Sequence, residues 1–349
     1  MTLTLITGAP GWIGTRWVQA LTEGWPDAPN RREPKPAGRI RCLVIPGLDA
    51  TVIRVSGQVE IVQGDLRDPE AVTAFCRKAE GATLYHCAGV VHPARRTREF
   101  YDINVAGTRR LLQAAEEAGV RRVVVLSSNS PAGANPCRDH RFDENSPYHP
   151  YMGYGRSKML MEQVVLEYQA RGKLETVILR PTWFYGPFQP ARQTAFFRMI
   201  RSGRAPIAGD GENLRSMTYI DNLCQAMRLC EHAPIANGRI YWVADEKPYS
   251  MNEIINTVER LMETEFALPV AHKRLRLPSL ASEAAWLADT LIQGLGFYHQ
   301  KIHVLSEMNK TIACSVEKAR QELGYKPAVG LEEGMRRSLA WCLANGIKL

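Results

Sequence analysis

The chain has 349 residues, of which 45% are hydrophobic and 23% are charged, the balance of a globular protein that buries a substantial core. Its formal net charge is +8 at pH 7, but the basic pairs are scattered among acidic residues, which argues against a nucleic-acid partner and fits a pocket for an anionic small molecule. Eight cysteines without a C-x-x-C pair predict reduced thiols and argue against a disulfide framework.

Short β-rich runs alternate with amphipathic segments through the first half of the sequence. Residues 2–7 predict a strand and 12–21 a helix, and a polar, proline-rich insertion follows at 23–38. Further predicted elements are strands 40–45 and 59–63, helix 69–79, strand 83–87, helix 100–118, strand 122–127, helix 152–168 and strand 176–180. This alternation predicts an α/β fold, a Rossmann-type doubly wound parallel sheet covered on both faces.

The alternation loosens after Pro181. Strands are predicted at 217–220 and 239–243, and helices at 222–231, 251–263, 315–323 and 331–345. We therefore expect a smaller C-terminal substrate lobe, interwoven with the first domain. The predicted dinucleotide-binding domain is 1–180, to which 215–245 returns, and the predicted substrate lobe is 181–214 with 246–349.

The segment 275–297 in this lobe is apolar enough to line a hydrophobic pocket, touch a membrane surface or pack as a helix. Its most apolar part, 280–295, is broken by Glu283, Asp289 and Gln293 and is too short and too polar to span a bilayer, so no membrane span is expected. The N-terminal sequence lacks the basic region and cleavage site of a signal peptide, and we expect a cytoplasmic protein. His299 and His303 are four residues apart without a third ligand, so no metal site is predicted.

The first predicted strand runs directly into a glycine-rich turn that opens the first helix. Glycines three residues apart permit a tight turn, let the backbone approach a pyrophosphate and expose amide groups at the positive end of a helix. This strand–turn–helix context predicts a dinucleotide site. Its predicted residues are Gly8, Gly11, Trp12, Ile13 and Gly14.

The cofactor is predicted to be NAD or NADP. At the end of the second strand an acid accepts the ribose hydroxyls of NAD, whereas an arginine pairs with the 2′-phosphate of NADP. This chain has Ile45 there. Asp49 and Arg54 follow it, and the first would favour NAD whereas the second would favour NADP. Because no arginine stands at the strand end itself, we lean to NAD.

Three residues are predicted to carry the chemistry. Tyr154 and Lys158 are four apart on one helical face, where an ammonium and a positive nicotinamide ring favour the phenolate of a residue that is otherwise a poor base. Ser128 follows the strand 122–127, where its hydroxyl is placed to hydrogen-bond the substrate oxygen; Ser127 and Ser130 are rivals. The predicted reaction moves a hydride to or from a carbinol carbon while Tyr154 carries the proton.

These motifs together resemble the extended branch of the short-chain dehydrogenase/reductase superfamily, of the NAD-dependent epimerase/dehydratase type. The resemblance implies that Asp65 and Leu66 (in Gly-Asp-Leu) face the adenine and that Ala88 and Gly89 lie along the cofactor. It assigns the catalytic serine to Ser128. It also assigns Pro181 to the cofactor site and brings Asn104 near it, with helix packing as an equal alternative for Asn104. It further implies a homodimer formed through helices 100–118 and 152–168.

Two segments narrow the resemblance. The residues G-D-G-E-N at 209–213 and R-P-T-W-F-Y-G-P at 180–187 are similar to 3β-hydroxysteroid and sterol-4-carboxylate dehydrogenases. The resemblance implies an NAD(P)-dependent oxidoreductase that interconverts a secondary alcohol and a ketone, with a small molecule as its partner. The candidate substrate residues are Asn129, Thr182, Trp183, Arg192 and Arg215.

The main alternative is a nucleotide-sugar epimerase with tightly bound NAD. Trp183 replaces the asparagine usual in such enzymes. By contrast, Arg215 fits a diphosphate, with Arg192, Arg198 and Arg204 as possible support. A 4,6-dehydratase is disfavoured because Asn129-Ser130 replaces its Asp-Glu pair. A non-catalytic cofactor-binding regulator is a third hypothesis, although such proteins usually lose the tyrosine or the lysine, and this chain keeps both.

Overall fold

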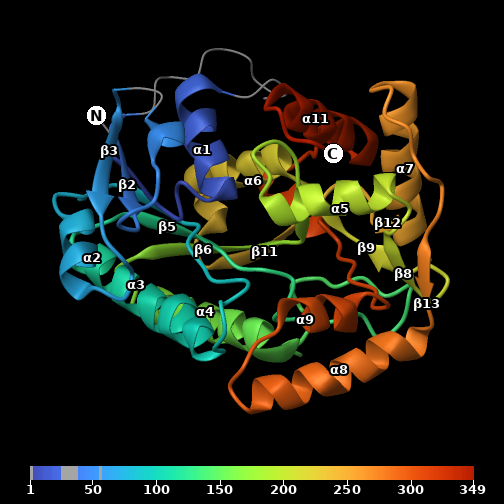
Figure 1. Cartoon of the computed structure of the whole chain (residues 1–349). Helices are drawn as coiled ribbons and strands as arrows, with labels where there is room; N and C mark the ends of the chain where they lie inside the picture. The colour runs from blue at the N-terminus through green and yellow to red at the C-terminus, as the bar shows by residue number, and fades with distance from the viewer. Residues whose placement is uncertain (1–2, 25–37, 55–56) are drawn as a thin grey trace.

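A seven-stranded parallel sheet forms the centre of the molecule, in the order β3-β2-β1-β4-β5-β6-β11 (Figure 1). The computed structural model describes residues 3–24, 38–54 and 57–349, so most of the predicted insertion at 23–38 lies outside the described residues. The strands are β1 (Thr4–Thr7), β2 (Ile40–Val44), β3 (Val59–Gln63), β4 (Thr83–His86), β5 (Arg122–Leu126), β6 (Glu175–Pro181) and β11 (Arg239–Val243). The predicted doubly wound sheet is confirmed.

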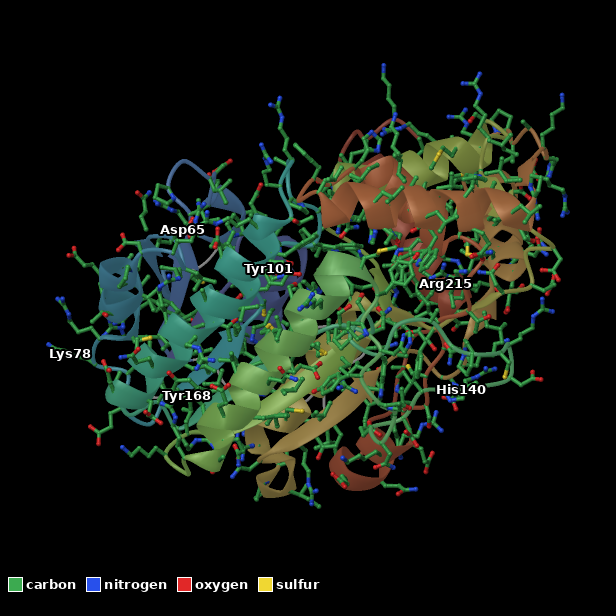
Figure 2. All side chains as sticks on the ribbon, turned by 90° about the horizontal axis from the view of Figure 1, so that it is seen from below. Asp65, Lys78, Tyr101, His140, Tyr168 and Arg215 are labelled. Atoms are coloured by element: carbon green, nitrogen blue, oxygen red, sulfur yellow. The ribbon has the colours of Figure 1, made fainter. Side chains whose placement is uncertain are left out.

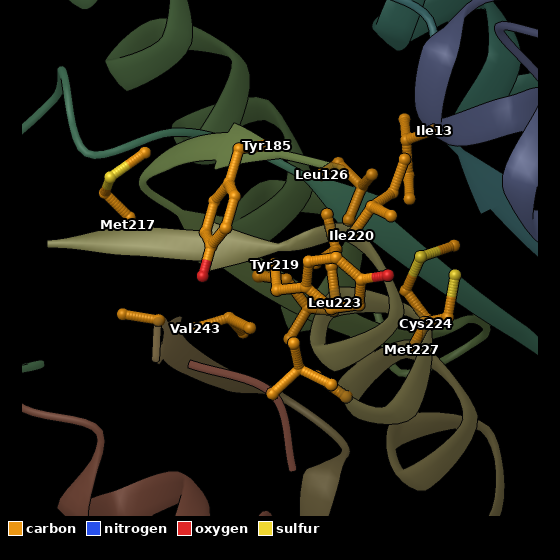
Figure 3. Packing of buried hydrophobic residues seen from close by; sticks show 14 of the residues in the cluster. Ile13, Leu126, Tyr185, Met217, Tyr219, Ile220, Leu223, Cys224, Met227 and Val243 are labelled. Carbon is orange, nitrogen blue, oxygen red and sulfur yellow. The ribbon is translucent and has the colours of Figure 1, made fainter. Parts of the chain in front are cut away.

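Helices cover both faces of the sheet. On one face α1 (Trp12–Glu23) and α6 (Ile220–His232) pack over the strands, and on the other lie α2 (Pro69–Cys76), α3 (Thr108–Glu117) and α4 (Met152–Ala170). Figure 3 shows the first side, where Leu126 of β5 lies near Ile13 of α1 and the α6 residues Leu223 and Met227 fill the space below. Because both faces are covered, the inner strands β1, β4 and β5 are buried along their whole length.

The predicted helix 100–118 is two elements. A π-helix, η2 (Phe100–Gly107), precedes α3. Widened turns of this kind are frequent at functional sites. The Thr108 hydroxyl donates to the carbonyl of Asn104 (2.7 Å), inside the π-helical turn. The hydrophobic spacing of the segment does not distinguish a π-helix from an α-helix, so the sequence predicted one uninterrupted helix.

The second half of the chain builds a smaller lobe beside the carboxyl ends of the strands. Its remaining elements are β7 (Trp183–Tyr185), α5 (Ala191–Arg201), β8 (Pro206–Ala208), β9 (Leu214–Arg215), β10 (Met217–Tyr219), β12 (Tyr249–Ser250), α7 (Met251–Thr264), β13 (Leu275–Leu277), α8 (Ser279–Gly294), α9 (Gln300–Glu307), α10 (Glu317–Leu323) and α11 (Leu331–Ala344). The predicted strand 217–220 is β10, whereas the other short strands, α5 and α9 were not predicted. The lobe boundaries at 180, 214 and 245 stay predictions. In the described part of the chain, no helix is both long and apolar enough to cross a membrane.

Candidate active site

The turn between β1 and α1 leaves no room for side chains. Gly8 has φ +83°, and a Cβ there would lie 2.6 Å from the backbone nitrogen of Ala88. A Cβ on Gly14 would lie 2.4 Å from the carbonyl oxygen of Gly8, and one on Gly11 would lie 2.6 Å from the same atom. The first turn of α1 carries no acidic residue and no side-chain cap. Exposed backbone amides at the positive end of a helix suit a pyrophosphate. This glycine turn, Gly8 to Gly14, is called the cofactor cradle below, and it fits NAD or NADP.

Replacing Gly8 with alanine is expected to weaken dinucleotide binding about tenfold or more. Alanine costs about 1–2 kcal/mol in this backbone region, and its methyl group would also push against the loop after β4. Isothermal titration with NAD and NADP measures the effect. Gly172→Ala is the matched control, since Gly172 has φ +71° but a Cβ there meets nothing within 4 Å. Equal affinities for the two variants would contradict the assignment of the cradle.

Farther along the sheet edge, the residues expected near the adenosine already have partners. The carboxylate of Asp65 accepts hydrogen bonds from Nε and Nη2 of Arg67 (3.0 and 2.7 Å), and this pairing lowers its pKa. Leu66 is buried against Gly107. Ile45 is exposed beyond the end of β2, and Asp49 accepts from the backbone and hydroxyl of Thr51.

The loop after β4 is fixed from two sides. His86, which is buried, bridges the hydroxyls of Thr7 and Thr108 (2.8 Å each), and burial lowers its pKa to about 3, so it is neutral. Asn104 accepts from the Val90 amide (2.8 Å) and donates to the Val90 carbonyl and the Ser157 hydroxyl (3.0 Å each). In these contacts Asn104 ties this loop to α4 and acts as a positioning residue.

Ser128, Tyr154 and Lys158 converge at the carboxyl ends of β4 and β5. Ammonium Nζ of Lys158, which is buried, donates to the Leu126 carbonyl (2.8 Å). A Cβ on Gly89 would lie 3.5 Å from the same nitrogen, so Ala88-Gly89 passes directly over it. Tyr154 is half-buried on the first turn of α4, and the Ser128 hydroxyl is close enough to its phenol to lower the pKa of that group.

The structure separates the rival serines. Ser127 donates to Oε1 of Glu162 (2.5 Å), a carboxylate that also binds Arg180, and its hydroxyl is therefore occupied in the interior. Ser128 shares its hydrogen with Ser130 or with Oδ1 of Asn129 (3.2 and 3.4 Å) and is the serine that reaches the phenol. This geometry favours Ser128 as the residue that holds a substrate oxygen.

The pKa of the Tyr154 phenol is raised in this structure, whereas a neighbouring cation was expected to lower it. Burial raises the pKa of Tyr154 to about 12, and the groups that oppose this are the Ser128 hydroxyl and then the Arg192 guanidinium. Lys158 was expected to be the cation that lowers it. Instead, burial lowers the pKa of Lys158 itself to about 8, and its ammonium is directed at a backbone carbonyl. Arg192 is therefore the cation that opposes the rise in the pKa of the phenol.

Replacing Arg192 with glutamine is expected to move the acid limb of the pH–rate profile for alcohol oxidation to higher pH. Without this cation the pKa of Tyr154 rises further, and a larger pH is needed to reach the same fraction of phenolate. Steady-state rates of oxidation across a pH series measure the shift. Arg198→Gln, on the same helix with its guanidinium on the Lys348 carbonyl, is the control and should leave the profile in place.

Aromatic rings form the wall beside the phenol. The Phe100 ring lies 5.9 Å from that of Tyr154 and 5.7 Å from that of Tyr298. Tyr298 hydrogen-bonds Nδ1 of His92 (2.5 Å) and lies 5.5 Å from His303. None of these four neighbours was predicted as a site residue. They come from three separate parts of the sequence, and no local motif marks them.

The other predicted substrate residues are spread along the same side of the molecule. Thr182 is buried against the Thr218 hydroxyl (2.9 Å), and Trp183 packs edge-on against Phe196. Arg215, labelled in Figure 2, donates to the Glu307 carbonyl, and its buried Nε has no partner in the described structure. Burial lowers the pKa of Arg215. Pro181 ends β6 in register with Val243.

The histidines weighed as metal ligands have other partners. His303 pairs with the buried carboxylate of Asp289 (2.8 Å), and His299 accepts from the Ile302 amide at the start of α9. Within the described ranges no group of three or more potential ligands is close enough to hold a metal ion.

Relatives of known sequence include hydroxysteroid dehydrogenases and sugar 4-epimerases. The y4nL protein of Sinorhizobium fredii is 52% identical, over 99% of this chain and 96% of its own length. The 3 beta-hydroxysteroid dehydrogenase type 7 of Mus musculus is 28% identical, over 97% and 95%. The N-acetyl-alpha-D-glucosaminyl-diphospho-ditrans,octacis-undecaprenol 4-epimerase of Escherichia coli O157:H7 is 27% identical, over 77% and 74%.

Solved structures share the fold over almost the whole chain. The UDP-glucose 4-epimerase of Thermotoga maritima, with UDP-glucose, has a TM-score of 0.75 at 19% identity, covering 99% of this chain and all of that one. DesIV, a dTDP-glucose 4,6-dehydratase of Streptomyces venezuelae with NAD and TYD bound, has a TM-score of 0.75 at 24% identity, covering 99% and 98%. Residues 4–244 match the NAD-dependent epimerase/dehydratase family. The chain therefore belongs to this family, as its motifs predicted, and is an NAD(P)-dependent enzyme of the extended short-chain dehydrogenase/reductase superfamily.

Proposed function

We propose that this enzyme interconverts a secondary alcohol and a ketone on an apolar, hydroxysteroid-like substrate, with Ser128, Tyr154 and Lys158 as its catalytic residues. The observation that carries the proposal is the aromatic wall beside the phenol. The Phe100 ring packs beside Tyr154 and the Tyr298 ring packs on Phe100, and both rings are buried, so this side of the phenol is apolar. Flat apolar rings are favourable partners for stacked or edge-on aromatic and alicyclic surfaces.

The roles of the three residues follow from their positions. The nicotinamide ring supplies a hydride acceptor or donor when it is bound. Tyr154 takes the hydroxyl proton in oxidation and returns it in reduction, while Ser128 holds the substrate oxygen through a hydrogen bond. Lys158, beneath Gly89, is placed to bind the nicotinamide ribose and to keep positive charge close to the phenol.

We propose NAD rather than NADP as the preferred cofactor. Ile45 at the end of β2 offers no charge to a 2′-phosphate, and the Asp49 carboxylate lies just beyond it. A homodimer through η2, α3 and α4 is part of the same proposal, and analytical ultracentrifugation measures it. Figure 2 shows these helices side by side, with Tyr101 and Tyr168 labelled on them.

One observation favours epimerisation of a nucleotide sugar as a second candidate. Arg192 forms no ion pair within the described ranges, and Arg215 has a buried Nε without a partner. Two arginines with unused donors suit a diphosphate. The relatives include both activities, so the test must separate them.

The purified enzyme itself supplies the test. An epimerase returns the hydride that it removes, so it retains NAD and needs none added, whereas a dehydrogenase exchanges cofactor and produces reduced nicotinamide. Denaturing the protein and analysing released nucleotide by chromatography gives the first result. Absorbance of reduced nicotinamide with 3β-hydroxysteroids, compared with product analysis on UDP-sugars, gives the second. Epimer formation without net reduction would overturn the dehydrogenase proposal.

A further inference from the structure

The outer face of α8 is a stripe of exposed leucines. The exposed fractions of Leu280, Leu287, Leu291 and Leu295 are 77%, 58%, 71% and 75%. Their spacing of seven, four and four residues places them along one side of the helix. Trp286 on α8 and Phe297 just after it are also exposed. An apolar surface of this extent on a protein marks a site of interaction.

One of the two carboxylates of α8 is buried, and the other is held in an ion pair beside the leucine stripe. Asp289 is fully buried and pairs with His303 (2.8 Å). Glu283 is bound to Lys310 (2.5 Å) and Asn309 (2.9 Å). Asp289 thus faces the protein, and the charge of Glu283 is paired with Lys310. Figure 1 shows α8 at the edge of the molecule.

Cationic side chains stand at both ends of the stripe. The Arg96 guanidinium lies 4.3 Å above the Phe297 ring, and Arg95 is linked to Tyr298 through its backbone. Lys301 is exposed at the start of α9, and Arg276 is exposed on β13 before the other end of α8. Among residues 3–24, 38–54 and 57–349, none of these four side chains forms an ion pair. An apolar stripe with unpaired cations at its rim is complementary to an anionic surface with an apolar interior.

We propose that α8 and Phe297 form a peripheral docking surface for an anionic lipid bilayer. A helix of 16 residues is about 24 Å long and lies in the plane of the interface, with its leucines at the boundary between head groups and acyl chains. The rim cations add electrostatic attraction to anionic lipid. A second copy is disfavoured as the occupant. A two-fold pairing of this face, with the helices antiparallel, would bring the Arg276 end of one helix against the Arg96 end of the other, both positive.

The docking surface is linked to the segment that carries Tyr154 by direct side-chain contacts. Gln293 of α8 accepts a hydrogen bond from the Gly153 amide (2.9 Å), next to Tyr154 in the chain, and Tyr298 packs on Phe100. Docking would therefore hold the aromatic wall close to the bilayer surface. This last step rests on the proposed apolar substrate, whereas the docking surface itself does not.

The test is co-sedimentation of the full chain with vesicles. We expect the protein to bind vesicles of phosphatidylcholine mixed with phosphatidylglycerol, to bind pure phosphatidylcholine less, and to lose affinity as salt is raised. The double variant Leu287→Glu with Leu291→Glu should lower this binding at least tenfold, since two apolar contacts become charged. Leu343→Glu, an exposed leucine on α11, is the matched control and should bind as the unmodified protein does.

Three outcomes would overturn the proposal. The first is absence of wild-type binding to the mixed vesicles, and the second is unchanged binding by the double variant. The third is a lower oligomeric state of the double variant in ultracentrifugation without lipid, which would make this face a contact between copies. Circular dichroism checks that each variant is folded. Activity on a water-dispersed hydroxysteroid is measured in parallel, so failure of the proposed function is seen separately from failure of docking.

Discussion

Replacing Tyr154 with phenylalanine is expected to lower kcat by about 10²–10⁴-fold, the range for removal of a general acid–base group. The ring of phenylalanine keeps the contact with Phe100, whose centroid lies 5.9 Å away, but it has no proton to exchange. The glycine cradle and Lys158 are unaffected, so the dissociation constant for NAD should stay close to that of the unmodified enzyme. Steady-state kinetics and isothermal titration on the same preparation measure both quantities.

Tyr168→Phe and Ser127→Ala are suited as controls for this experiment. Tyr168 is on the same helix, and its hydroxyl makes only a long hydrogen bond to the Arg109 carbonyl (3.4 Å). Ser127→Ala removes a hydroxyl that is held by Glu162, whereas Ser128→Ala removes the one at the phenol. We expect a large loss of kcat for Ser128→Ala and near-normal kcat for both controls. A kcat for Tyr154→Phe equal to that of Tyr168→Phe would remove the basis for the catalytic assignment.

The sheet and the cofactor cradle were predictable because local chemistry determines them. Strands buried on both faces are continuous apolar runs, so Arg122–Leu126 and Ile40–Val44 were found within one residue at each end. The glycine turn is a local constraint as well, since Gly8 needs a positive φ that only glycine adopts without strain. Tyr154 and Lys158 lie on one helix, and their spacing alone puts them on one face.

The substrate side was not predictable, since its residues meet only through tertiary structure. His92 and Tyr298 are 206 positions apart and share a hydrogen bond of 2.5 Å. Arg192 was predicted as a substrate contact, but its effect on the phenol depends on where α5 packs. The expected role of Lys158 in lowering the pKa of the phenol stays a prediction. The direction of its ammonium is determined by the Leu126 carbonyl on another strand.

The largest effect on stability is expected from the ion pair behind Ser127. The side chains of Glu162 and Arg180 are 0% and 3% exposed and meet at 2.7 Å. Tyr148 also donates to Glu162 (2.8 Å), and Arg180 lies between the rings of Tyr148 and Trp242. Glu162→Ala leaves a guanidinium buried without its partner, so the free energy of unfolding should fall by about 3–5 kcal/mol. Urea titration followed by circular dichroism measures it.

The double variant Glu162→Leu with Arg180→Met distinguishes a buried charge from a lost contact. Replacing both charges by apolar side chains of similar size removes the unpaired guanidinium, so most of the stability lost in Glu162→Ala should return. If the pair acted like an exposed one, Glu162→Ala would cost less than about 1 kcal/mol and the second substitution would restore nothing.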